Sequence, residues 1–126
     1  MRLLWICLGG AVGTGARYLV ATSLARLLGS GFPWGTLTVN VVGSLLLGAI
    51  MQLGLNTQLL SPDLRLILAT GVMGGFTTYS TFNYETLQYL REGALWLTAL
   101  NVAGTLLLCL VAGMLGVATA RWVTGS

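Results

Sequence analysis

Four long apolar stretches, separated by short polar segments, dominate the hydropathy pattern of the chain. They cover about residues 3–28, 34–53, 62–91 and 94–123. An apolar run of about 20 residues is long enough to cross the hydrocarbon core of a bilayer as a helix. The pattern therefore predicts an all-α membrane protein, with a single domain over residues 1–126 that has four transmembrane helices.

The third stretch combines clear end signals with an interruption near its middle. It begins at Ser61 and Pro62, a hydroxyl N-cap followed by proline at the first helical position, and Gly93 fits its C-terminal end. The interruption starts at the adjacent glycines 74 and 75 and continues into a run of short polar residues: Thr77, Thr78, Ser80, Thr81 and Asn83. Glycine weakens a helix, and these polar side chains compete for its backbone hydrogen bonds.

Each half of this stretch, before Gly74 and after Ser80, would be about 17 Å long, which places the interruption close to the bilayer midplane. Lipid cannot satisfy the N–H and C=O groups that a helix break sets free. We therefore predict a third helix that is broken at the membrane centre and faces protein, water or an ion there.

The first stretch contains a packing signal and one unusual charge. Gly9 and Gly13 have the spacing that lets another helix approach closely. Arg17 lies deep in the same stretch, where an arginine is costly unless it snorkels to the interface or faces water. Both interpretations of Arg17 remain open from the sequence.

Polar residues recur at helical spacing in the second and fourth stretches. Asn40 and Ser44 are four residues apart, and so are Asn101 and Thr105, so each pair lies on one helix face. Such a stripe either holds helices together or lines a pore. Taken alone, the pattern favours interhelical hydrogen bonds, because Asn in a membrane helix commonly bonds to a neighbour.

Composition excludes several classes of protein. Hydrophobic residues make up 56% of the 126 residues and charged residues only 7%, far from the roughly 25% charged residues of a soluble domain. The net charge of +3 is scattered, so no basic patch for nucleic acid is present. The apolar stretches hold no histidine and no paired carboxylates, which argues against an enzyme. Cys7 and Cys109 lie in apolar surroundings and are expected to act as small hydrophobic residues.

Arginines give little information about orientation in the membrane. With four crossings, Arg2, Arg65 and Arg121 share one side, whereas Arg26 and Arg91 share the other. The positive-inside bias is therefore nearly cancelled. A chain without a strong bias can insert both ways, which makes an antiparallel, dual-topology dimer possible.

The predicted membrane centre offers neutral hydrogen-bond donors rather than charges. Glu85 lies toward the end of the third stretch, and the absence of a mid-depth carboxylate argues against proton-coupled export. Hydroxyls and amides suit a small hydrated anion, and the electropositive edges of Tyr79 and Phe82 could approach one. Carbonyls freed at a helix break can instead coordinate an alkali cation, which would hold two crossing chains together.

These residues resemble the fluoride channel family, the Fluc or CrcB proteins that export fluoride from microbial cells. The similarity covers nearly the whole chain and rests on three segments: Gly9-Gly10-x-x-Gly13 leading to Arg17-Tyr18, Gly35-Thr36-Leu37-x-Val39-Asn40-x-x-Gly43, and Gly74-Gly75-x-Thr77-Thr78-aromatic-Ser80-Thr81-Phe82 with Glu85. The third segment is highly specific.

The resemblance implies a four-helix subunit in a dual-topology antiparallel homodimer, with two fluoride pores and one central, structural sodium ion. It implies passive export of fluoride across the inner (plasma) membrane of a bacterium, which protects the cell against fluoride toxicity. The backbone carbonyls of Gly74 and Thr77 would bind the sodium ion, and Arg17 and Glu85 would lie in vestibules. The implied fluoride pore includes Asn40, Tyr79, Ser80, Thr81, Phe82, Asn101 and Thr105, and Ser44 joins them as a polar residue on the stripe of Asn40.

The chain departs from the family pattern at one position. The first aromatic of the pore is usually Phe, whereas here it is Tyr79, whose hydroxyl could donate to the anion or project elsewhere. Two other classes of membrane protein fit this sequence less well than the channel. A small multidrug-type exporter needs a membrane-embedded glutamate in its first span, which is absent, and a structural helper subunit leaves the hydroxyl track unexplained.

Overall fold

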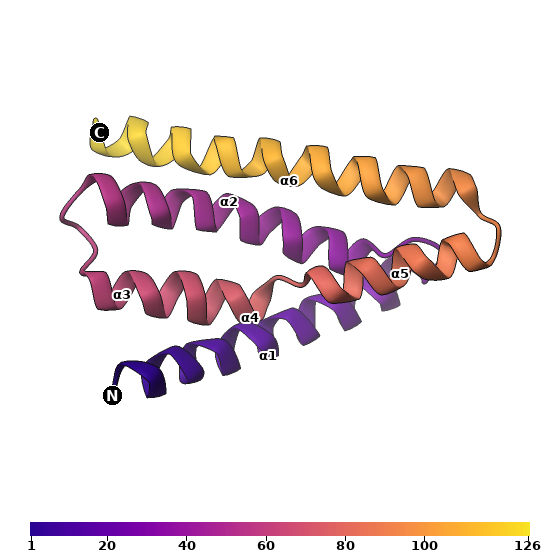
Figure 1. Cartoon of the computed structure of the whole chain (residues 1–126), viewed down its shortest axis with the longest axis horizontal. Coiled ribbons are helices and arrows are strands. Elements are labelled where there is room, and N and C mark those ends of the chain that lie inside the picture. Colours follow the sequence, from indigo (N-terminus) through magenta and orange to yellow (C-terminus); the bar gives the residue numbers. More distant parts are fainter.

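The computed structural model describes residues 1–126, and all of its regular structure is helical. Its elements are α1 (Arg2–Leu28), α2 (Trp34–Asn56), α3 (Pro62–Leu66), the π-helix η1 (Ile67–Met73), α4 (Gly74–Phe76), α5 (Tyr79–Arg91) and α6 (Leu95–Thr124). Three of them, α1, α2 and α6, are long and apolar enough to cross a membrane. The helices run alongside one another, and both termini lie at the same end of the molecule (Figure 1).

The third apolar segment is built from four short elements, α3 to α5. Two residues with extended backbone separate α4 from α5: Thr77 has φ −89° and ψ 161°, and Thr78 has φ −152° and ψ 118°. The adjacent glycines at the start of this region, Gly74 and Gly75, are helical and form α4. The helical geometry is therefore lost at the threonines and not at the glycines.

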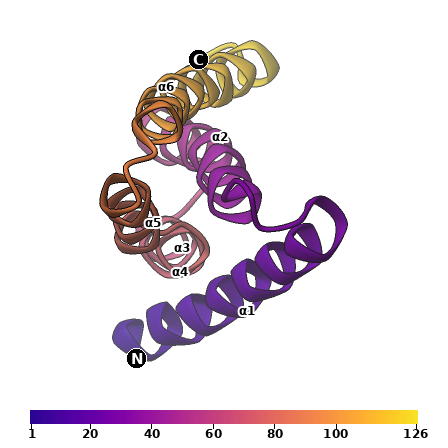
Figure 2. The same cartoon turned by 90° about the vertical axis from the view of Figure 1, so that its right-hand side faces the viewer.

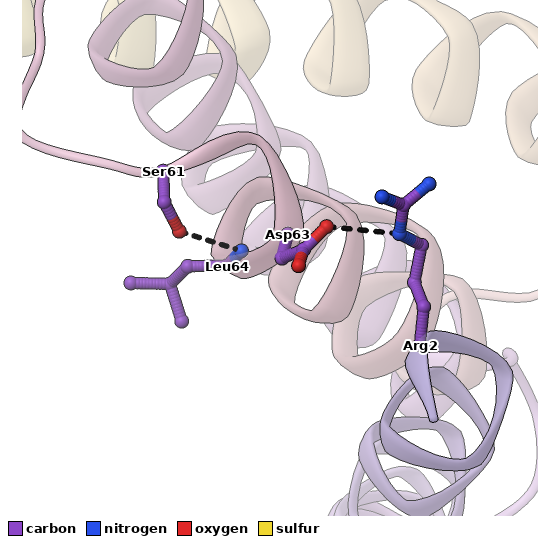
Figure 3. Close-up of polar contacts among 4 residues, drawn as sticks. All are labelled: Arg2, Ser61, Asp63 and Leu64. Atoms are coloured by element: carbon purple, nitrogen blue, oxygen red, sulfur yellow. Dashed lines mark hydrogen bonds and ion pairs between the residues drawn. The ribbon is translucent and has the colours of Figure 1, made fainter.

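The predicted start and end signals of this segment are confirmed. Ser61 Oγ accepts a hydrogen bond from the Leu64 N–H at 3.1 Å, which caps α3. Beside this cap, Arg2 Nε lies 2.8 Å from Asp63 Oδ1 and joins the start of α1 to α3 (Figure 3). Both side chains of this ion pair are more than 60% exposed, so its contribution to stability is small. At the other end, Gly93 follows α5 with φ +75°, a conformation that favours glycine.

Small residues allow the helices to approach closely. A Cβ atom at Gly13 of α1 would lie 2.0 Å from the carbonyl oxygen of Val72, so the predicted packing role of this glycine is confirmed. Between α2 and α6, a Cβ at Gly116 would lie 1.9 Å from the carbonyl oxygen of Leu45. Figure 2 shows α2 between α1 and α6, with α3, α4 and α5 to one side.

Large apolar side chains cover the outside of this arrangement instead of filling a core. Only 12 of the 126 residues are buried, and exposed leucines, valines and tryptophans occur on α1, α2 and α6. Such a surface fits lipid or a second protein chain. The fold is thus that of a multi-pass membrane protein whose helices are joined mainly through small residues.

Candidate ion pathway

A cavity of about 620 Å³ lies where α2, the extended residues after α4, α5 and α6 meet. The cavity combines hydroxyl, amide and aromatic groups with leucine and valine side chains. Six of the site residues expected from the sequence line it: Asn40, Ser44, Thr77, Tyr79, Phe82 and Thr105. Residues from three segments that are distant in the sequence therefore share one space.

Asn40 of α2 is paired with the backbone of Thr78. Its Nδ2 donates to the Thr78 carbonyl oxygen at 3.0 Å, and its Oδ1 accepts from the Thr78 N–H at 2.8 Å. One amide side chain thus satisfies both polar backbone groups of an extended residue. The second Nδ2 hydrogen has no protein acceptor and remains available at the cavity.

The two aromatic residues expected in the pore lie next to each other on α5. The ring centroids of Tyr79 and Phe82 are 5.9 Å apart, and the ring planes are inclined by 60°. The two rings differ in burial, because Tyr79 is 77% exposed whereas Phe82 is partly buried. Phe82 therefore belongs to the wall of the cavity within this chain, and most of Tyr79 lies open to its surroundings.

The hydroxyl groups at the start of α5 divide into two sets. Thr78 Oγ1 donates to Thr81 Oγ1 at 3.0 Å and accepts from the Thr81 N–H at 3.3 Å, so it serves as the N-cap of α5. Ser80 is exposed on the outside of the chain and does not line the cavity. Thr81 does not line it either, although its hydroxyl is bonded to a lining residue.

On α6, only one of the two expected polar residues lines the cavity. Asn101 is 1% exposed, and its Nδ2 donates to Thr86 Oγ1 of α5 at 3.0 Å. Thr105 Oγ1 lies 3.5 Å from Asn101 Oδ1, at the limit of a hydrogen bond, and this threonine reaches the cavity. In this chain Asn101 therefore makes the interhelical hydrogen bond that a stripe of polar residues also predicts.

The backbone carbonyls of Gly74 and Thr77 flank the point where the helix is interrupted. Neither accepts a hydrogen bond from the residue four positions later, and no side chain donates to them. Gly74 is also exposed on the surface of the chain. Neutral carbonyl oxygens are ligands for hard cations, so this pair fits an alkali ion chemically.

The two residues expected in vestibules lie in different environments. Glu85 lines a second cavity of about 480 Å³ near the connection between α1 and α2. Its Oε2 accepts from Thr36 Oγ1 at 3.1 Å, while its Oε1 is buried without a hydrogen-bond partner. Arg17 lies outside this cavity, and its Nε donates to the Gly75 carbonyl oxygen at 3.0 Å.

The role of Thr36 was not expected from the sequence. Thr36, Asn40 and Ser44 are spaced by four residues on α2, so one stripe reaches both cavities. This continuous spacing was the signal that could have identified Thr36. Through its hydrogen bond, Thr36 links the carboxyl group of Glu85 to α2, the helix that also carries Asn40.

Comparisons with known proteins identify the family. Residues 4–117 match the model of the family described as CrcB-like protein, Camphor Resistance (CrcB). Three curated relatives carry the name fluoride-specific ion channel FluC. The relative from Anaeromyxobacter sp. (strain K) is 52% identical, with 98% of each chain covered. The relative from Sorangium cellulosum is 57% identical, with 95% of this chain and 94% of the relative covered. The relative from Geobacter sulfurreducens is 50% identical, with 94% of this chain and 96% of the relative covered.

These matches extend over nearly the full length of both partners in each comparison. They include the α2 stripe, the interruption between α4 and α5, and the residues that line the larger cavity. The relatives are ion channels, which agrees with the expectation that the chain is not an enzyme. The chain belongs to the CrcB-like family, in which relatives bear the name of fluoride-specific ion channels.

Proposed function

We propose that this chain forms a fluoride-selective channel that passively exports fluoride from the bacterial cytoplasm across the inner membrane and so protects the cell against fluoride toxicity. The observation that carries the proposal is the cavity that joins Asn40, Phe82 and Thr105. It combines an amide, a hydroxyl and an aromatic ring at the centre of a multi-pass membrane fold. The names of the relatives support the same ion.

The groups in this cavity can replace part of the hydration shell of fluoride. Hydroxyl and amide N–H groups donate hydrogen bonds directly to an anion. The edge of an aromatic ring is electropositive and adds a weaker attraction in the plane of the ring. None of these groups needs to gain or lose a proton, which suits passive conduction rather than proton-coupled transport.

We further propose that two chains assemble as an antiparallel homodimer with dual topology. In the isolated chain, Gly74, Tyr79 and Ser80 are exposed beside the interruption. Lipid would leave the backbone groups at this point unsatisfied, whereas a second chain would cover them. A partner would also bring Ser80 and the open part of Tyr79 into contact with protein, where Ser80 and Thr81 would complete the fluoride path.

A structural sodium ion would join the two chains at the membrane centre. Each chain would contribute the carbonyl oxygens of Gly74 and Thr77, giving four ligands in total. The support for this site is that both carbonyls lack hydrogen-bond donors within the chain. The ion would neutralise the partial negative charges of these oxygens and hold the interruption open.

Purified protein in liposomes tests the channel function. Vesicles loaded with potassium fluoride and supplied with a potassium ionophore should release fluoride when the protein is present. Vesicles loaded with potassium chloride should retain it, because chloride is larger and gains less from the narrow set of donors. Absence of fluoride release, or equal release of chloride, would reject the proposal.

A further inference from the structure

We propose that Asn40 and Arg17 are positioning residues, which bond to backbone groups adjacent to the sodium ligands and thereby keep the carbonyls of Gly74 and Thr77 free for the ion. The inference rests on the sodium site of the proposed function. It assigns to two polar side chains a role in cation binding that neither performs by direct contact.

Asn40 acts on the first ligand by removing its natural donor. In a continuous α-helix the N–H of Thr78 would donate to the carbonyl of Gly74, four residues earlier. That N–H donates instead to Asn40 Oδ1 at 2.8 Å, and the Thr78 carbonyl accepts from Asn40 Nδ2 at 3.0 Å. The amide of Asn40 thus stabilises the extended conformation of Thr78 and leaves Gly74 without its helical partner.

The surface of α2 is shaped to bring Asn40 to this position. Gly43 lies one turn after Asn40 on the same side of the helix. A Cβ atom at Gly43 would lie 2.2 Å from Cγ2 of Thr77, so only glycine allows α2 to approach so closely. Thr77 is held from its other side, because its N–H and its hydroxyl both donate to the Met73 carbonyl, at 3.0 and 2.9 Å.

Arg17 acts on the carbonyl that lies between the two proposed ligands. Its Nε donates to the Gly75 oxygen at 3.0 Å, across 58 positions of sequence. The approach of α1 needed for this bond is close, since a Cβ at Gly75 would lie 2.4 Å from the Gly10 carbonyl oxygen. The Gly75 carbonyl is therefore occupied and directed toward α1, whereas the carbonyls of Gly74 and Thr77 have no such donor.

The test measures how fluoride release from liposomes depends on sodium, with N-methylglucamine as the replacement cation. The sodium concentration for half-maximal release is obtained separately from the maximal rate. Asn40→Ala should raise this concentration about tenfold, because loss of the amide pair costs on the order of 1.4 kcal/mol. Arg17→Ala should raise it as well, because the Gly75 carbonyl loses its donor.

Asn40→Asp separates positioning from conduction. The carboxylate still accepts the Thr78 N–H but cannot donate to the Thr78 carbonyl, so the half-maximal sodium concentration should rise less than with Asn40→Ala. The maximal rate should fall, because a negative charge faces the fluoride path. Asn56→Ala is the matched control, since Asn56 is also on α2 but bonds only to Gln52 near the helix end. It should change neither quantity.

Size-exclusion chromatography and retention of radioactive sodium by the purified protein complete the test. An Asn40→Ala protein that binds sodium like the wild type would overturn the positioning role. If Asn40→Asp raised the half-maximal sodium concentration as much as Asn40→Ala, the positioning role would also be overturned. This comparison holds even if the alanine variant folds poorly. Absence of sodium retention and of sodium dependence in the wild type would instead remove the proposed sodium site itself.

Discussion

The Nδ2 atom of Asn101, a residue with 1% exposure, donates to Oγ1 of Thr86 at 3.0 Å and joins α6 to α5. Thr86 Oγ1 in turn donates to the carbonyl oxygen of Phe82 at 2.8 Å, one turn earlier on α5. A chain of two hydrogen bonds therefore runs from the N-terminal part of α6 to the aromatic residue in the wall of the cavity. Its function within this chain is to hold α5 against α6.

This relationship predicts a measurable coupling between the two helices. Asn101→Ala and Thr86→Ala should each destabilise the protein, and their combined effect should fall short of additivity by about 0.6 to 1.7 kcal/mol, the range of interhelical hydrogen bonds in membranes. Unfolding in mixed micelles measures the free energies. Thr98→Ala is the control, because Thr98 Oγ1 donates to the carbonyl oxygen of Ala94, four residues earlier, and so joins no two helices. Strict additivity of the Asn101 and Thr86 effects would contradict the coupling.

Two glycines of α1 provide a matched test of close helix packing. A Cβ at Gly13 would lie 2.0 Å from the Val72 carbonyl oxygen, whereas a Cβ at Gly15 would have no atom within 4 Å. Gly13→Ala should therefore destabilise the chain by about 1 to 3 kcal/mol, the usual cost of overpacking. Gly15→Ala should have little effect on the same unfolding curve. Equal stability of the two variants would show that α1 does not pack against η1 as described.

Dual topology predicts that the same chain inserts in both orientations. Reporter tags at either terminus should give signals on both sides of the membrane, because three arginines face one side and two the other. Addition of two lysines beside Arg121 should shift the population toward the orientation with the termini inside. A single fixed orientation of the unmodified chain would reject the antiparallel dimer.

The sequence predicts the local signals of this fold better than the partners of its polar groups. Ser61 and Gly93 were identified as helix end signals because capping depends on neighbours in sequence. The glycines at 74 and 75 were expected to weaken the helix, yet both are helical. Only Gly75 packs closely on α1, since a Cβ there would lie 2.4 Å from the Gly10 carbonyl oxygen, whereas a Cβ at Gly74 would meet no atom closer than 3.9 Å. The extended backbone falls on Thr77 and Thr78 instead, where the pairing with Asn40 supplies the missing hydrogen bonds.

In the candidate site, too, the sequence predicts which residues share a helix face but not which partners their polar groups have. The spacing of Asn40 and Ser44 showed that they share a helix face, and the cavity contains both. Spacing could not distinguish residues that line a cavity from residues that bond to another helix, and α6 contains one of each: Thr105 lines the cavity, while Asn101 bonds to Thr86. The bond from Arg17 to Gly75 and the bond from Thr36 to Glu85 join positions 58 and 49 residues apart. No local pattern encodes such distances.

Phe82 lines the cavity and supplies the ring edge that we propose faces fluoride. Phe82→Ile keeps an apolar side chain at this position but removes the electropositive edge of the ring. Loss of an interaction worth about 1.4 kcal/mol at the highest barrier corresponds to about a tenfold slower flux. Leu90→Ile is the matched control, because Leu90 lies on the same helix, is exposed and does not line the cavity.

The decisive measurement is passive fluoride release from liposomes that contain the wild type, Phe82→Ile or Leu90→Ile at equal protein content. The cavity described above predicts rapid release with the wild type and the control, and at least about tenfold slower release with Phe82→Ile, which should still elute as a dimer. Wild-type release by Phe82→Ile would show that fluoride does not pass along this wall of the cavity.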